Sequence, residues 1–96
     1  MNTIQHFVNG KKFSGESKRV GKVFNPATGE QSAEVKLAST KDVNDAVSNA
    51  KKAFEEWSNK PPLHRARIMF KYKDLIEKNS DELTKIIVSE HGKVYE

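Results

Sequence analysis

The segment AEVKLASTKDVNDAVSNAKKAFEEW, residues 33–57, changes its hydrophobic period, and this change organises the chain. In its first part Ala33, Val35 and Leu37 alternate with polar residues, which predicts a strand with one buried face. After Ser39 the apolar residues follow the i, i+3, i+4 spacing of an amphipathic helix. They are Val43, Ala46, Val47, Ala50, Ala53, Phe54 and Trp57. We therefore expect strands and turns over residues 1–38 and helices over residues 39–96.

Upstream of this segment, turn residues separate short candidate strands. Residues 7–13 form a hairpin pattern around Asn9-Gly10, because these residues tolerate the positive φ angles of a two-residue turn. A second turn is expected at residues 15–17. A strand is expected at residues 20–24, followed by a turn at residues 25–30, in which Pro26 fixes φ and Gly29 can be left-handed.

Downstream, cap residues divide the helical part into three. Ser39 or Thr40 can cap the first helix, and Asp42 lies in its first turn, where the helix dipole favours a carboxylate. Residues 59–62 end that helix. The second helix is expected from Pro62 to about Lys78. Asn79 and Ser80 should end it and cap the third helix, which has Asp81 and Glu82 in its first turn and ends at Gly92.

The expected fold class is an α+β segment of short antiparallel strands followed by three helices, in one domain over residues 1–96. The 96-residue length, with 35% apolar and 31% charged residues, is too small for a second core. The helices carry more apolar surface than so short a sheet could cover, so we infer that further structure belongs on the C-terminal side. The absence of cysteine, of a signal peptide and of a long apolar run favours a soluble cytoplasmic protein.

The net charge of +4 is concentrated in the strands, since residues 1–38 hold six Lys or Arg against three acidic residues. Lys11, Lys12, Lys18, Arg19 and Lys22 could form a basic patch for nucleic acid. The neighbouring aromatic residues Phe7, Phe13 and Phe24 have the spacing of the inner face of strands, so solvated surface is the preferred interpretation.

Candidate chemical groups are sparse. His6, His64 and His91 have no partner at metal-ligand spacing, and His64 is read as an exposed residue of a helix's first turn. Asp81, Glu82 and Glu90, with His91 beside Lys93, could suggest acid–base chemistry, but a helix end with basic residues near its negative pole is favoured. Gly92-Lys93 lacks the other residues of a phosphate loop, no G-x-G-x-x-G motif is present, and Ser14, Ser17, Ser58 and Ser89 lack a nucleophile-elbow context.

Five pieces, taken in order, resemble the opening of the aldehyde dehydrogenase superfamily. Each piece alone is weak, but the ordered set is specific and covers nearly the whole chain. The pieces are residues 6–11 as a first strand and turn, the Asn-Pro-Ala-Thr-Gly-Glu turn within residues 23–30, the helix from Asp42 to Trp57, the helix from Arg67 to Asn79, and residues 81–93.

Within this superfamily the chain is most similar to the CoA-acylating methylmalonate-semialdehyde dehydrogenases. The similarity rests on Pro61-Pro62-Leu63 followed by residues 65–70, on Glu-His-Gly-Lys at residues 90–93, and on Val94 after the lysine. It implies the start of an α/β aldehyde dehydrogenase fold, with an aldehyde and coenzyme A as substrates and a homo-oligomer as the assembly.

The resemblance also implies a reaction in which NAD⁺ accepts hydride from a thiohemiacetal of an aldehyde with a cysteine. The acyl group then passes to coenzyme A, and the substrate carboxylate can be lost. No residue here matches a catalytic, cofactor-binding or metal position of the family, and Arg65 and Arg67 match a helix with a packing role. We therefore expect a part of such an enzyme that is not competent alone, with no nucleic acid and no membrane as partners.

Two alternatives remain open from the sequence. One is a small basic binding module, for nucleic acid or a protein, with no enzymatic activity. The other is an interaction protein that assembles with longer subunits of the same family.

Overall fold

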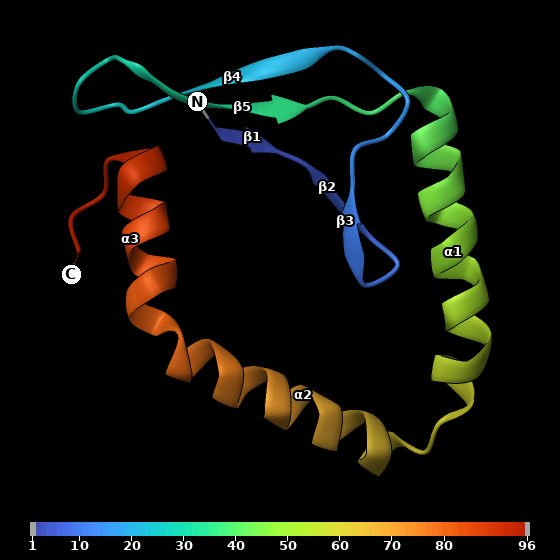
Figure 1. Cartoon of the computed structure of the whole chain (residues 1–96). Coiled ribbons are helices and arrows are strands. Elements are labelled where there is room, and N and C mark those ends of the chain that lie inside the picture. The colour runs from blue at the N-terminus through green and yellow to red at the C-terminus, as the bar shows by residue number, and fades with distance from the viewer. Residues whose placement is uncertain (1, 96) are drawn as a thin grey trace.

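The computed structural model describes residues 2–95, and its elements follow the predicted order of strands and then helices (Figure 1). The predicted fold class is therefore confirmed. The strands are β1 (Asn2–Ile4), β2 (His6–Val8), β3 (Lys11–Phe13), β4 (Val20–Phe24) and β5 (Gln31–Lys36), and the helices are α1 (Thr40–Asn59), α2 (Pro62–Lys78) and α3 (Ser80–His91).

The hairpin predicted at Asn9-Gly10 is present. Strands β2 and β3 pair antiparallel, with His6 opposite Phe13 and Val8 opposite Lys11. Asn9 has φ 54° and Gly10 has φ 76°, so both turn residues adopt the positive φ that a two-residue turn of this hand requires.

The second sheet has the strand order β1-β5-β4 and contains one feature that the sequence did not predict. Strands β4 and β5 are antiparallel and are joined by the predicted turn, in which the Asn25 backbone amide donates to Glu30 O at 2.9 Å. Strand β1 instead pairs parallel with β5, against the expectation of antiparallel strands alone. Its three residues are too few to show a period, and its partner lies 31 positions away, as in the Thr3–Glu34 pair.

The helix boundaries follow from local chemistry. Ser39 caps α1 in a reciprocal capping box with Asp42, which decides between the two predicted caps. Gly92 ends α3 in the left-handed conformation with φ 80°. The predicted recapping before α3 is wrong in one respect, because no side chain caps that helix. The Asn79 side-chain amide donates back to Leu75 O of α2 at 2.8 Å instead.

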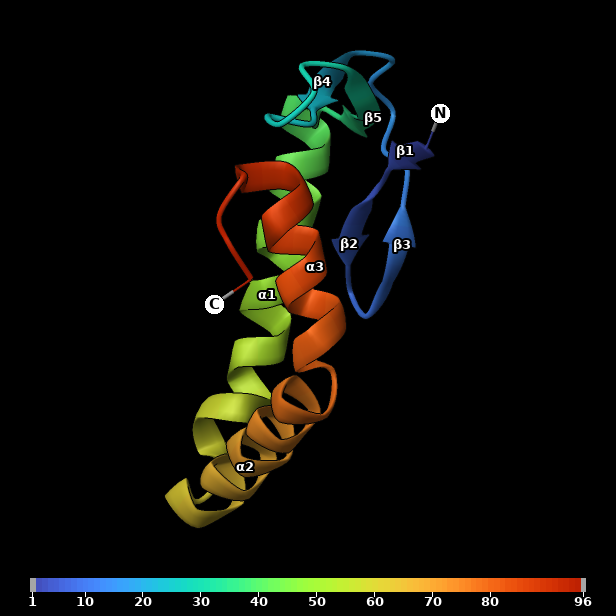
Figure 2. The same ribbon diagram turned by 90° about the vertical axis from the view of Figure 1, so that its left-hand side faces the viewer.

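The strands and the three helices of residues 2–95 form an open ring, which we call the frame, and the helices do not pack into a bundle (Figure 1). The described chain measures 48 × 37 × 15 Å, and Figure 2 shows this thin dimension. Its radius of gyration is 17.1 Å, against about 12.5 Å for a compact domain of this length. Within residues 2–95 the buried apolar side chains are limited to Ala33, whereas Phe54 on the apolar face of α1 remains 65% exposed. The expected excess of apolar helix surface is therefore present.

The turn after β4 and the end of α3 lie close together. A Cβ atom placed on Gly92 would lie 3.1 Å from Cγ of Pro26. Two turn residues far apart in the sequence are thus in contact, and the glycine permits this approach.

Candidate functional site

The candidate metal-binding and catalytic residues that the sequence offered do not lie close together. His6 lies on β2, His64 on α2 and His91 at the end of α3. Among residues 2–95, no three His, Cys, Asp or Glu side chains are close enough together to hold a metal ion. His6 Nε2 is a buried atom without a hydrogen-bond partner, and its ring lies 6.1 Å from that of Phe13.

The acidic residues of α3 lie at its two ends. Asp81 is in the first turn and Glu90 near the last, so about 13 Å of helix axis separates them. Asp81 Oδ1 accepts a hydrogen bond from the Tyr95 hydroxyl, and this bond is the main cause that raises the pKa of Tyr95. His91 lies in the last turn, as the interpretation of a helix end requires.

The basic residues of the front segment are divided between two sheets. Lys11 and Lys12 lie on β3 and Lys22 on β4. Arg19 has a structural role, since its Nη2 donates to Ala38 O at 2.9 Å. The placement of the aromatic residues on an inner face is wrong, because Phe7, Phe13 and Phe24 are all exposed. Phe7 and Phe13 line a groove against α1, which leaves both rings open to solvent in the described chain.

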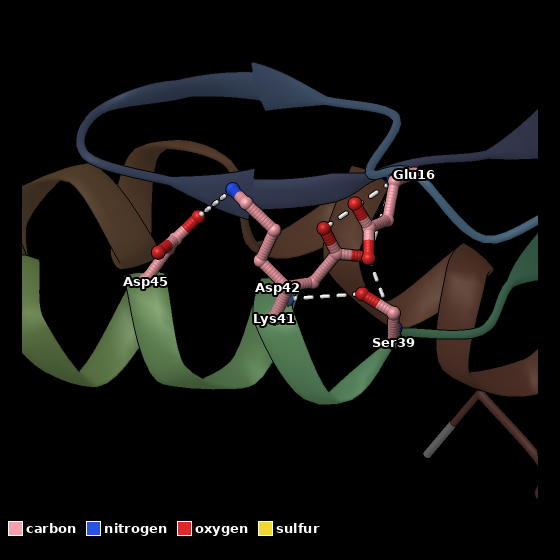
Figure 3. Close-up of polar contacts among 5 residues, drawn as sticks. All are labelled: Glu16, Ser39, Lys41, Asp42 and Asp45. Atoms are coloured by element: carbon pink, nitrogen blue, oxygen red, sulfur yellow. Dashed lines mark hydrogen bonds and ion pairs between the residues drawn. The ribbon is translucent and has the colours of Figure 1, made fainter.

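The best-organised polar cluster surrounds Asp42 at the start of α1 (Figure 3). Asp42 is 5% exposed and is the buried charged residue of the described chain. Its Oδ2 accepts from the Ser39 backbone amide at 3.0 Å, and Ser39 Oγ accepts from the Asp42 amide at 3.0 Å. Both carboxylate oxygens also lie 3.3 Å from the backbone nitrogen of Glu16, which donates to them across 26 positions of sequence.

These donors favour the charged carboxylate. The backbone amide of Ser39 lowers the pKa of Asp42 most, whereas burial opposes this effect. The Ser39 side chain, the Glu16 amide and the nearby His6 imidazole lower the pKa further. Asp42 is therefore a structural anion that accepts hydrogen bonds from the cap of α1 and from the loop that contains Glu16.

Gly15 is required beside this carboxylate. It has φ 75°, and a Cβ atom at this position would lie 2.4 Å from Asp42 Oδ2. The sequence indicated a turn at Gly15 and a cap at Asp42, but not that the two meet. The Ser-x-x-Asp spacing of residues 39–42 predicts the cap alone, because the contact with Gly15 is a tertiary one.

A groove of about 310 Å³ lies between the hairpin and α1. Its walls are formed by Val8, Asn9, Lys11, Phe13, Ala46, Asn49 and the acidic residues Asp42 and Asp45. Two acidic residues against one lysine, without a glycine-rich loop, do not suit the diphosphate of a dinucleotide. This groove therefore does not fit NAD.

A model of the aldehyde dehydrogenase family matches residues 13–96. The chain belongs to the aldehyde dehydrogenase family. This confirms the family to which the ordered motifs pointed, and the basic binding module is not favoured. Within residues 2–95 of this aldehyde dehydrogenase chain, no helix has both the length and the apolar character needed to cross a bilayer.

Relatives of this aldehyde dehydrogenase chain match it almost throughout. The malonate-semialdehyde dehydrogenase of Pseudomonas aeruginosa is 40% identical over 96 residues, which are 100% of this chain and 19% of that protein. Malonate-semialdehyde dehydrogenase 3 of Geobacillus kaustophilus is 43% identical over 94 residues, 98% of this chain and 19% of that protein. The aldehyde dehydrogenase chain therefore spans about a fifth of the length of these relatives.

Solved structures contain the same frame. A methylmalonate-semialdehyde dehydrogenase from Oceanimonas doudoroffii is 49% identical with a TM-score of 0.94, covering 99% of this chain and 19% of that one. A structure described as the corresponding enzyme of Sinorhizobium meliloti 1021, complexed with NAD, is 42% identical with a TM-score of 0.96 and the same coverage. The open arrangement of strands and helices is thus the one that these longer proteins contain.

Proposed function

We propose that this aldehyde dehydrogenase chain is the N-terminal portion of an NAD-dependent, CoA-acylating methylmalonate- or malonate-semialdehyde dehydrogenase. The reaction converts a semialdehyde, coenzyme A and NAD⁺ into an acyl-CoA, CO₂ and NADH. One observation carries the proposal: nearly the whole chain matches proteins named malonate- or methylmalonate-semialdehyde dehydrogenase at 40–49% identity, and the solved structure among them has the same three-dimensional frame.

Residues 1–96 contribute scaffold to this enzyme. We propose that they form the N-terminal part of one aldehyde dehydrogenase domain and that none of them contacts the reacting atoms. The carboxylate-lined groove supports this, since it does not suit NAD. The coenzyme, the aldehyde and coenzyme A would be bound by the part of the relatives' length that this chain does not span. We further propose that the whole enzyme is a homo-oligomer located in the cytoplasm.

A chimeric enzyme tests this function. Residues 1–96 replace the matching segment of the Pseudomonas aeruginosa relative, and NADH formation from malonate semialdehyde is followed with and without coenzyme A. We expect coenzyme A-dependent turnover within about tenfold of the parent enzyme, or about 1.4 kcal/mol in the activation barrier. The parent without its first segment should be inactive.

The matched control is a chimera that carries the corresponding segment of the Geobacillus kaustophilus relative instead. An active control beside an insoluble or inactive chimera with residues 1–96 would contradict the proposal. The acylating activity is tested on the protein as expressed from its own gene, where NADH formation from malonate semialdehyde that does not depend on coenzyme A would contradict it.

A further inference from the structure

The hairpin arm, defined as residues 5–14, is attached at its base. On one side β1 continues into the β1-β5-β4 sheet. On the other side Gly15 and Glu16 lie against Asp42 at the start of α1. Across the base, Gln5 Nε2 donates to Ser14 Oγ at 2.9 Å, which ties the two ends of the arm together.

Beyond its base the arm lies beside α1 (Figures 1 and 2). Grooves of about 310 and 320 Å³, each lined by residues of both the hairpin and α1, remain between them. Phe7, near the middle of β2, is 73% exposed. The grooves show that the arm is not packed tightly on α1 beyond its base, so the contacts at the base help to position it.

Among these contacts, the Asp42 carboxylate joins the helix to Gly15 and Glu16, the residues that directly follow the arm. It completes the cap of α1 through Ser39 and accepts the Glu16 backbone amide from the segment that leaves the arm. The absence of a side chain at Gly15 allows this approach. His6 from β2 and Lys41 and Asp45 from α1 are the neighbouring charged or titratable groups, and Lys41 is already paired with Asp45 at 2.7 Å.

We propose that the Asp42 carboxylate is a latch that holds the hairpin arm closed beside the N-terminal half of α1. When the Glu16 amide leaves the carboxylate, the arm turns about Gln5 and Ser14, and the groove along α1 widens. The cap of α1 does not depend on Glu16, so the helix remains intact. The hairpin arm thus opens independently of the helix beside which it lies.

Amide hydrogen exchange of the protein, as expressed from its own gene, tests the latch. Gly15→Ala places a methyl group against the carboxylate, and Asp42→Asn weakens the acceptor. In both variants we expect exchange at residues 5–16 to be at least about tenfold faster, because the local opening equilibrium shifts toward the open arm. Exchange in α2 should change less than about twofold.

Gly29→Ala is the matched control. Gly29 has the same φ of 75°, but a Cβ atom there meets nothing within 4 Å, so this variant carries the backbone strain without the clash. It should leave exchange of the arm unchanged. In the unsubstituted protein the Glu16 amide must itself be protected. An unprotected Glu16 amide, or equal acceleration in the arm and in α2, would overturn the latch.

Discussion

At the scale of the residue, Asp42 is a buried carboxylate that accepts hydrogen bonds from two distant segments of the chain. A buried carboxylate is costly unless donors surround it, and here three hydrogen bonds from two backbone amides reach its oxygens. The same carboxylate thereby fixes both a helix start and a loop 26 positions earlier. Substitutions around Asp42 should therefore separate helix capping from attachment of the arm.

The first prediction is that the Glu16 amide is released from Asp42 only in strong acid. The pKa of Asp42 is lowered, so its contribution to stability is complete above the unfolded value of about 3.9 and is lost as the pH falls through the lower folded pKa. We expect protection of the Glu16 amide to persist at about pH 5 and to disappear only in stronger acid, as followed by NMR. The Asp42→Asn variant should lack this transition, and loss of protection near neutral pH would contradict the prediction.

The second prediction concerns Ser39. Ser39→Ala removes the acceptor of the Asp42 backbone amide at the cap of α1. In the protein as expressed from its own gene, the free energy of local opening of the first turn of α1 should fall by about 1 kcal/mol, measured by amide hydrogen exchange. Ser48→Ala, an exposed serine within the same helix, is the control and should be neutral or slightly stabilising. Equal effects of the two substitutions would argue against the cap.

At the scale of the element, turns and caps were predictable because their signals lie within a few residues of each other. Asn9-Gly10 predicted the hairpin, Pro62 the start of α2 and Gly92 the end of α3, and the structure contains all three. Pairing between elements was not predictable in this way. The parallel pairing of β1 with β5 joins segments whose sequences show no common pattern.

The third prediction belongs to the contact between the turn after β4 and α3. Gly92→Ala should lower the free energy of unfolding by about 1–2 kcal/mol for its left-handed backbone, with a further loss because its Cβ would meet Pro26 at 3.1 Å. Gly29→Ala has similar backbone strain in open space and should cost less. Urea denaturation of both variants of the protein as expressed from its own gene gives the comparison, and equal losses would show that the Pro26 contact contributes nothing.

At the scale of the whole molecule, the frame is extended and nearly without a core. Its radius of gyration of 17.1 Å and the exposure of the apolar faces of all three helices distinguish it from a compact domain. The same frame occurs within solved structures about five times longer, since it covers 19% of them.

The fourth prediction follows from this shape. The 96-residue chain produced alone should be loosely packed or self-associate, because exposed apolar surface lowers its free energy by finding cover. Analytical ultracentrifugation and binding of a hydrophobic dye measure these two behaviours. A monomer with cooperative two-state unfolding would refute the prediction.

The sequence by itself determined the order of the elements, most of their boundaries and, through five motifs in order, the aldehyde dehydrogenase family. Each of these depends on residues close together in the chain or on their order along it. The tertiary structure alone decided that β1 lies parallel to β5, that Phe7, Phe13 and Phe24 are exposed, and that Asp42 receives the Glu16 amide. These features depend on how distant segments meet, and no local period or propensity encodes such a meeting.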